Sequence, residues 1–129
     1  PKSSGRDLFN SAWLNTKLQG NEALADVQMT LLELTSVTIA QAIQQYCVGA
    51  KEIYLCGGGA RNQSMRNRLI ALLPESRIQT TSALDVDSDF LEAIAFAWLA
   101  QQTLNGQPSN LPLVTGAKHA RVLGAVHHA

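Results

Sequence analysis

The feature that most constrains the fold is an apolar run that ends in three glycines and is followed at once by a helical pattern. The run covers residues 53–56, the glycines are Gly57, Gly58 and Gly59, and helical spacing resumes after Asn62. Glycine has no Cβ, so the backbone there can adopt positive φ and a ligand can approach the peptide plane closely. Amide groups at the start of the next helix favour an anionic or strongly polar group. The segment therefore predicts either a nucleotide site or a plain strand-to-helix turn.

The pattern around this segment predicts an α/β fold with helices packed on a short parallel sheet. Residues 53–56 are apolar on both alternating faces, as in an interior parallel strand, and residues 77–81 predict a second strand. A helix over 63–73, with Asn62 as its N-cap and Pro74 after it, separates the strands and makes them parallel. The glycines then lie at the carboxyl end of the first strand, where open α/β sheets usually bind ligands.

Further elements are expected on both sides of this unit. Residues 22–47 carry two apolar stripes, which predict a long helix that is buried on more than one side. A short helix is expected over residues 7–14, and an alanine-rich helix is expected over residues 90–104. Residues 107–120 predict a loop, and residues 122–126 predict a short terminal strand.

Composition limits the class of protein. Apolar residues make up 46% of the 129 residues, which predicts one soluble domain with a well-buried core. Ten Lys and Arg balance ten Asp and Glu, so the charge gives no reason to expect nucleic acid or a membrane surface as partner. The longest apolar run, residues 93–100, is far shorter than the roughly 20 residues of a membrane span. Cys47 and Cys56 lack a Cys-x-x-Cys spacing and are expected to be reduced, buried thiols in a cytoplasmic protein.

Two common nucleotide-binding signatures are absent. The dinucleotide fingerprint requires glycine where Asn62 stands, and no Gly-Lys-Ser/Thr of a Walker A loop occurs. What remains is a strand followed by three glycines and Ala60, a turn that would let an adenosine moiety lie against bare backbone. His119, His127 and His128 have no His or Cys at ligand spacing, so no metal site is predicted.

Four segments resemble the anhydro-N-acetylmuramic acid kinase family. They occur in the family's order and are spread over almost the whole chain: residues 1–9 (PKSSGRDLF), 55–62 (LCGGGARN), 89–100 (DFLEAIAFAWLA) and 110–117 (NLPLVTGA). The resemblance implies the actin-like, ribonuclease H-like ATPase fold, in which two lobes close over ATP and a sugar. Residues 1–129 would then be the C-terminal portion of a two-domain sugar kinase, on its adenosine-binding side, with the N-terminal lobe absent.

The resemblance also implies the activity. The family uses ATP, Mg²⁺ and water to open the 1,6-anhydro ring and phosphorylate the sugar to N-acetylmuramic acid 6-phosphate, a step of peptidoglycan recycling in the cytoplasm. Its members are commonly dimeric, which implies a homodimer. Because phosphoryl transfer depends on positioning and charge stabilisation by both lobes, the chain alone is expected to be inactive.

Roles for individual residues follow from the same resemblance. Gly57, Gly58 and Gly59 would contact the ribose and the α-phosphate through backbone atoms. Ala60 would belong to the same adenosine motif, and Asn62 would cap the next helix and border the nucleotide. The Mg²⁺ ion would be held mainly by the missing N-terminal part.

Two other sets of residues have both a structural and a functional interpretation. Asp89 and Glu92 have the spacing of a capping box, in which Glu92 bonds back to the helix start. The resemblance instead implies that Glu92 supports catalysis near the sugar, because the family's base aspartate lies in the absent part. Lys2, Ser4 and Arg6 lie in a glycine-containing loop that either holds sugar or phosphate or is simply solvated.

Two other functions stay open at this point. One is a non-catalytic regulatory or interaction domain that keeps a kinase-like fold, and the other is a related ATPase-superfamily kinase with a different acceptor. Arg61, Arg66 and Arg68 are expected to form a solvated helix face rather than a phosphate clamp. An upstream phosphate loop and base aspartate would distinguish the sugar kinase from the alternatives.

Overall fold

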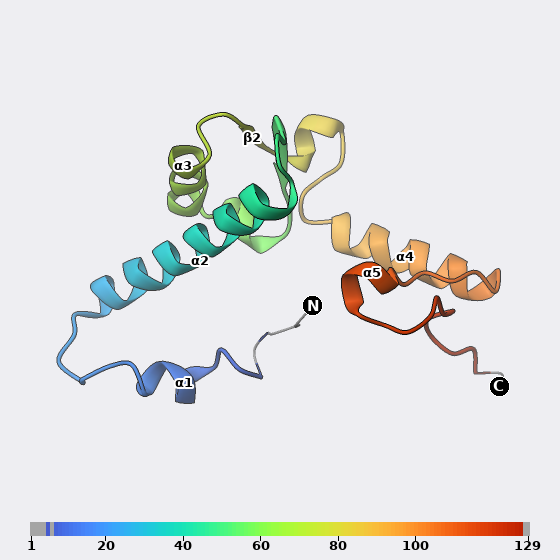
Figure 1. Ribbon diagram of the computed structural model, residues 1–129, viewed down its shortest axis with the longest axis horizontal. Coiled ribbons are helices and arrows are strands. Elements are labelled where there is room, and N and C mark those ends of the chain that lie inside the picture. Colours follow the sequence, from blue (N-terminus) through green and yellow to red (C-terminus); the bar gives the residue numbers. More distant parts are fainter. Residues whose placement is uncertain (1–4, 6, 128–129) are drawn as a thin grey trace. The chain divides into compact units, whose positions relative to one another are not determined.

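The computed structural model describes residues 5 and 7–127, which divide into two compact units. One unit is Glu22–Glu92, and the other consists of the described parts of Pro1–Asn21 and Ala93–Ala129. Figure 1 gives the order of the elements along the chain. The sequence predicts a single domain, so this division differs from the expectation.

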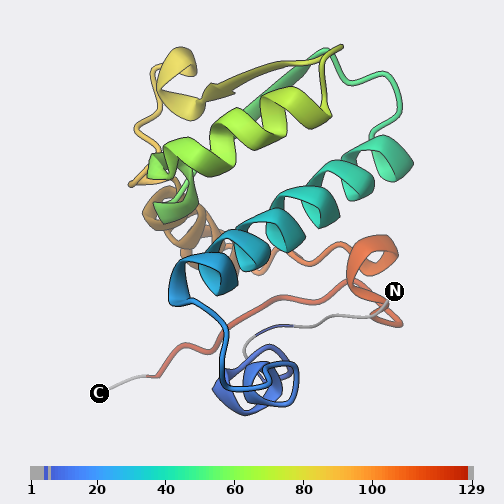
Figure 2. The ribbon, with the colours of Figure 1, turned by 90° about the vertical axis from the view of Figure 1, so that its left-hand side faces the viewer.

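The unit Glu22–Glu92 contains the predicted α/β arrangement. Its two long helices are α2 (Leu24–Tyr46) and α3 (Gln63–Leu72), which lie side by side next to the strands (Figure 2). Strand β1 (Glu52–Leu55) pairs in parallel with β2 (Arg77–Thr80), and Ile53 lies opposite Ile78. The predicted strand, helix, strand order and the parallel pair are confirmed.

The core of this unit is small. Leu69 of α3 is the most deeply buried large side chain, and Ala40 of α2 and Leu73 after α3 are buried beside it. Partly buried side chains from both helices and both strands pack around them: Ile39, Ile43, Ile53, Leu55, Met65, Leu72 and Ile78. Among the described residues only four apolar side chains are buried, the fourth being Ala60. The prediction of a well-buried core is therefore wrong for this chain.

Helix α2 is buried on one side only, contrary to the prediction from its two stripes. Ile39 and Ile43 of one stripe pack against the core. Leu24 and Leu34 of the other stripe are exposed, with 82% and 44% of their surface accessible. The stripes correctly predict an amphipathic helix, but the second stripe is only partly covered, because Val27 and Leu31 are half-buried whereas Leu24 and Leu34 are exposed.

The other unit has little regular structure outside one helix. Helix α1 (Ser11–Asn15) is shorter than predicted, because Asn10 caps it by accepting a hydrogen bond from the Trp13 amide at 3.0 Å. Helix α4 spans Leu91–Leu104, and the predicted loop after it contains one short helix, α5 (Pro112–Thr115).

The predicted terminal strand over 122–126 is wrong. Gly124 has φ of 92°, which extended backbone does not adopt, and the structure has no strand there. A Cβ at Gly124 would lie 3.2 Å from the Thr103 hydroxyl oxygen, so the bare backbone lets this segment approach α4 closely.

Helix α4 is apolar on every side and has no buried residue. Trp98, which its apolar neighbours predict to be in the core, is 49% exposed, and Phe96 is 63% exposed. A helix that is hydrophobic on all sides is normally buried, so the sequence pattern predicts that α4 buries more of its surface than it does here.

Both cysteines are free, as expected, but they are exposed rather than buried. Cys47 is the C-cap of α2 and Cys56 follows the last residue of β1, so each lies just outside the packed part of its element. The apolar composition of the flanking segments was a poor guide to burial because both positions are at element ends.

A bidentate ion pair joins α2 to α3. Arg68 donates from Nε and Nη2 to the two carboxylate oxygens of Glu33, both at 2.6 Å. These hydrogen bonds, assisted by the positive charge of Arg68, hold the pKa of the Glu33 carboxyl below its ordinary value. The expectation of a solvated arginine face is therefore wrong for Arg68.

This pair predicts a pH dependence of stability. A carboxyl whose folded-state pKa is lowered contributes stability above its unfolded-state pKa and loses it as the pH falls through the folded value. The stability difference between the wild-type chain and Glu33→Gln is therefore expected to shrink in acid. Urea unfolding between about pH 7 and about pH 3 measures it. Glu75→Gln, whose partner Lys51 is 4.0 Å away on the surface, is the control; a difference independent of pH would contradict the prediction.

Candidate functional site

The glycine segment begins where β1 ends, as the sequence predicts. Gly57 has φ of 70° and ψ of −172°, a conformation that favours glycine. Gly58–Arg61 then form a single 3₁₀ turn, η1. In a parallel pair the carboxyl ends of both strands lie at one edge, so this turn is at the edge where open α/β sheets usually bind ligands.

The outer face of this turn is bare. A Cβ placed on Gly57 or Gly58 would meet no other atom within 4 Å, and one on Gly59 would meet only the flexible end of Met65, at 3.1 Å. Gly58 and Gly59 are exposed. Ala60 is only 3% exposed, so its side chain is buried beneath the turn. Gly58 and Gly59 are therefore open to a ligand, whereas Gly57 is half-buried and its amide is bonded to Ser88.

The amides of Gly58 and Gly59 are free of partners within the described residues. The carbonyl oxygens of Gly57 and Gly59 accept hydrogen bonds from the Ala60 and Asn62 amides, both at 3.0 Å. The first amides of a helical turn have no intrahelical acceptor, so they are available to an anionic group. This arrangement supplies two adjacent donors on exposed backbone.

Asn62 has the predicted capping role. Its Oδ1 accepts a hydrogen bond from the Met65 amide at 3.1 Å and so starts α3. The side chain is exposed directly after η1. A position at the border of a ligand on the glycines is compatible with this placement.

Two contacts join the glycine segment to the segment before α4, and the sequence did not predict them. The Gly57 amide donates to the Ser88 carbonyl oxygen at 2.7 Å, and the Arg61 guanidinium forms an ion pair with the Asp89 carboxylate. Arg61 is solvent-exposed, as expected, with 74% of its side chain accessible, but the sequence did not predict its partner Asp89. The available signal was the parallel topology, which brings segments after β1 and after β2 to the same edge.

Glu92 lies in the first turn of α4 and is exposed. The capping-box alternative is not formed, because the Asp89 amide donates to Asp87 Oδ1 at 2.9 Å and the Asp89 carboxylate pairs with Arg61. Within the described chain the Glu92 carboxylate has no hydrogen bond or ion pair. It is therefore free to take part in chemistry.

The remaining sequence-based candidates divide into two groups. Lys2, Ser4 and Arg6 lie outside the described residues. Arg66 is partly buried, and its Nε has no hydrogen-bond partner in the described chain, so it is not on a fully solvated face.

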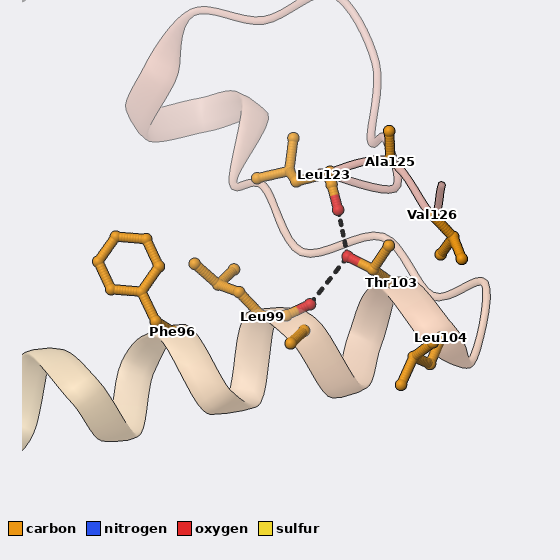
Figure 3. A pocket seen from close by; sticks show the side chains of 9 residues that line it. Phe96, Leu99, Thr103, Leu104, Leu123, Ala125 and Val126 are labelled. Atoms are coloured by element: carbon orange, nitrogen blue, oxygen red, sulfur yellow. Dashed lines mark hydrogen bonds between the residues drawn. The ribbon is translucent and has the colours of Figure 1, made fainter. Parts of the chain in front are cut away.

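An apolar groove lies along α4, within the second unit (Figure 3). Its walls come from one face of α4 and from the segment around Gly124: Phe96, Leu99, Ala100, Thr103, Leu104, Leu123, Gly124, Ala125 and Val126. The hydroxyl of Thr103 hydrogen-bonds to the carbonyl oxygens of Leu99 and Leu123, so it is already occupied. No charged side chain lines the groove, which therefore offers nothing to a phosphate.

The described residues show neither a metal cluster nor a membrane-spanning helix. No group of three or more His, Cys, Asp and Glu side chains comes together in a way that could hold a metal ion. None of the helices in this part of the chain has the length and apolar character needed to cross a membrane.

Parallel strands with a glycine turn at their carboxyl edge are typical of α/β proteins that bind nucleotides or other polar ligands. Residues 1–129 match the family described as Anhydro-N-acetylmuramic acid kinase. Proteins of that name from Thiobacillus denitrificans, Nitrosospira multiformis and Pasteurella multocida are 51%, 53% and 52% identical over 132, 129 and 130 residues. These alignments cover 100%, 100% and 98% of this chain.

The chain therefore belongs to the anhydro-N-acetylmuramic acid kinase family. It spans about a third of the length of the curated relatives it matches, since the alignments cover 36%, 35% and 34% of the three proteins.

Proposed function

We propose that this chain is the C-terminal, adenosine-binding part of an ATP-dependent kinase that acts on anhydro-N-acetylmuramic acid. The complete kinase opens the 1,6-anhydro ring with water and transfers the γ-phosphoryl group of ATP, which forms N-acetylmuramic acid 6-phosphate. It uses Mg²⁺, held mainly by the N-terminal lobe, and works in the cytoplasm, as a homodimer, in peptidoglycan recycling. Membership of the family over the whole chain supports this proposal.

The observation that carries the proposal is the bare glycine turn at the carboxyl end of β1. Gly58 and Gly59 are exposed, and their amides have no acceptor within the described residues. Two adjacent N–H donors match an α-phosphate oxygen, and the absence of side chains leaves room for a ribose. Gly57, Ala60 and Asn62 hold the turn in this conformation.

The sugar side is assigned to Glu92, with Lys2, Ser4 and Arg6 as further candidates. The free Glu92 carboxylate supports a role in hydrogen-bonding the sugar or orienting the attacking water. The aspartate that serves as base belongs to the N-terminal lobe, so the chain alone is proposed to be inactive. Phosphoryl transfer requires groups from both sides of the cleft.

Gly58→Val in the full-length kinase tests the nucleotide contact. Because a Cβ at Gly58 meets no atom of the protein, folding is expected to be unaffected. The added side chain would occupy the space proposed for the nucleotide, so the KM for ATP is expected to rise roughly tenfold, equivalent to about 1.4 kcal/mol. Steady-state kinetics with ATP varied at saturating sugar measures the effect.

Ala71→Val provides the matched control. Ala71 is exposed in the last turn of α3, so this substitution adds similar bulk away from the glycines. The KM for ATP is expected to stay at the wild-type value. An unchanged KM in Gly58→Val, with wild-type kinase activity present, would remove the glycine turn from the nucleotide site.

A further inference from the structure

The glycine turn is bracketed at both ends by one short segment that leads into α4. At its start, the Gly57 amide donates to the Ser88 carbonyl oxygen at 2.7 Å. At its end, Arg61 pairs with Asp89. The turn η1 therefore has its two ends attached to adjacent residues of another segment of the same unit.

That segment has its own fixed shape. Asp87 Oδ1 accepts a hydrogen bond from the Asp89 amide at 2.9 Å, and the Asp87 carbonyl oxygen accepts one from the Phe90 amide at 3.1 Å. These bonds fold residues 87–90 into a turn that ends where α4 begins. Glu92 follows two residues later, in the first turn of the helix.

We infer that Arg61 and Asp89 are a positioning pair that fixes the glycine turn relative to Glu92. The inference rests on the proposed function, in which the glycines contact the nucleotide and Glu92 serves the sugar. A rotation of η1 that breaks the pair would move the Gly58 and Gly59 amides relative to the first turn of α4. The pair thus sets the distance between two groups that must act on one reaction.

Because the pair is largely exposed, its effect on catalysis can be distinguished from its effect on the free energy of unfolding. The side chains of Arg61 and Asp89 are 74% and 35% exposed, and exposed ion pairs contribute little to the free energy of unfolding. Small geometric errors in a catalytic site are costly, because rate depends steeply on the alignment of reacting groups. The pair is therefore expected to affect kinetics much more than stability.

A double-mutant cycle in the full-length kinase tests the inference. Arg61→Gln and Asp89→Asn are each expected to raise the KM for ATP and lower kcat, with a loss of roughly fivefold to tenfold in kcat/KM. The double variant is expected to be no worse than either single variant, because both remove the same contact. Arg61→Lys, which keeps the positive charge, is expected to retain part of the activity, and exchange of the two charges to recover part of it.

The surface pair Lys51–Glu75 is the matched control. Its side chains are 73% and 88% exposed, and the two charged atoms are 4.0 Å apart. Lys51→Gln and Glu75→Gln are expected to leave kcat and the KM for ATP unchanged. Additive losses at Arg61 and Asp89, or losses no larger than at this control pair, would overturn the positioning role.

A readout without activity keeps the inference separate from the proposed function. Amide hydrogen exchange at Gly57 reports its bond to Ser88, and it is expected to accelerate in Arg61→Gln and Asp89→Asn but not in the Lys51 and Glu75 variants. A wild-type protein without kinase activity would refute the proposed function while this result still stood. Unchanged exchange at Gly57 would refute the pair even in an active kinase.

Discussion

Glu92→Gln in the full-length kinase is expected to lower kcat by roughly 10²-fold, the size of loss expected when the sugar or the attacking water is misplaced. The reason is that the Glu92 carboxylate is exposed and has no partner in the described part of the chain. It is therefore available to the substrate. The amide isostere keeps the size of the side chain but loses the negative charge and one of the two acceptor oxygens of the carboxylate. The KM for ATP is expected to change little.

Three measurements make this test specific. Initial rates with the sugar and ATP varied separately give kcat and both KM values. Thermal unfolding distinguishes a catalytic from a structural effect, because Glu92 makes no capping contact and its replacement is expected to leave the melting temperature unchanged. Glu75→Gln is the control and is expected to behave as wild type, because the Glu75 carboxylate is exposed and lies 4.0 Å from Lys51 Nζ. Full kcat in Glu92→Gln would restrict this residue to a structural or solvated role.

Leu69→Ala is expected to destabilise the chain by about 3 kcal/mol. Leu69 is 1% exposed and lies in the apolar core cluster, whose other buried side chains among the described residues are Ala40 and Leu73. With so few buried neighbours, the cavity left by the missing side chain removes a large share of the packing in this unit. Since folded domains have a margin of only about 5–15 kcal/mol, the variant is expected to be substantially unfolded under mild denaturation.

Urea unfolding followed by circular dichroism measures this loss. Ile70→Ala, at the next position of α3 and 48% exposed, is the matched control and is expected to cost much less. Equal losses at the two positions would show that Leu69 does not organise the core.

Local patterns predicted the α/β unit well. The Gly57–Asn62 segment fixed the end of β1 and the start of α3, because positive φ and N-capping depend on a few neighbouring residues. The parallel pairing followed from the helix between the strands. Burial was predicted poorly, because periodicity identifies an apolar face without identifying what covers it, as Leu24 of α2 and Trp98 of α4 demonstrate.

The candidate site was predicted in part. The glycines and the cap at Asn62 are local features, and the structure places them where the sequence puts them. The bond from Gly57 to Ser88 and the pair Arg61–Asp89 were missed, because they join residues 31 and 28 positions apart, respectively. Such contacts depend on the path of the chain after β2, which no local pattern specifies. The same contacts exclude the capping-box interpretation of Asp89 and Glu92, because the Asp89 carboxylate pairs with Arg61 and the Asp89 amide bonds to Asp87.

The low burial of α4 has a thermodynamic consequence. Unfolding raises the heat capacity in proportion to the apolar surface newly transferred to water, and α4 has no buried residue to transfer. Its melting therefore adds little to the heat-capacity increment of the chain. The helix is expected to lose its structure over a broad temperature range rather than in a sharp transition, because the segment around Gly124 packs against only one of its faces.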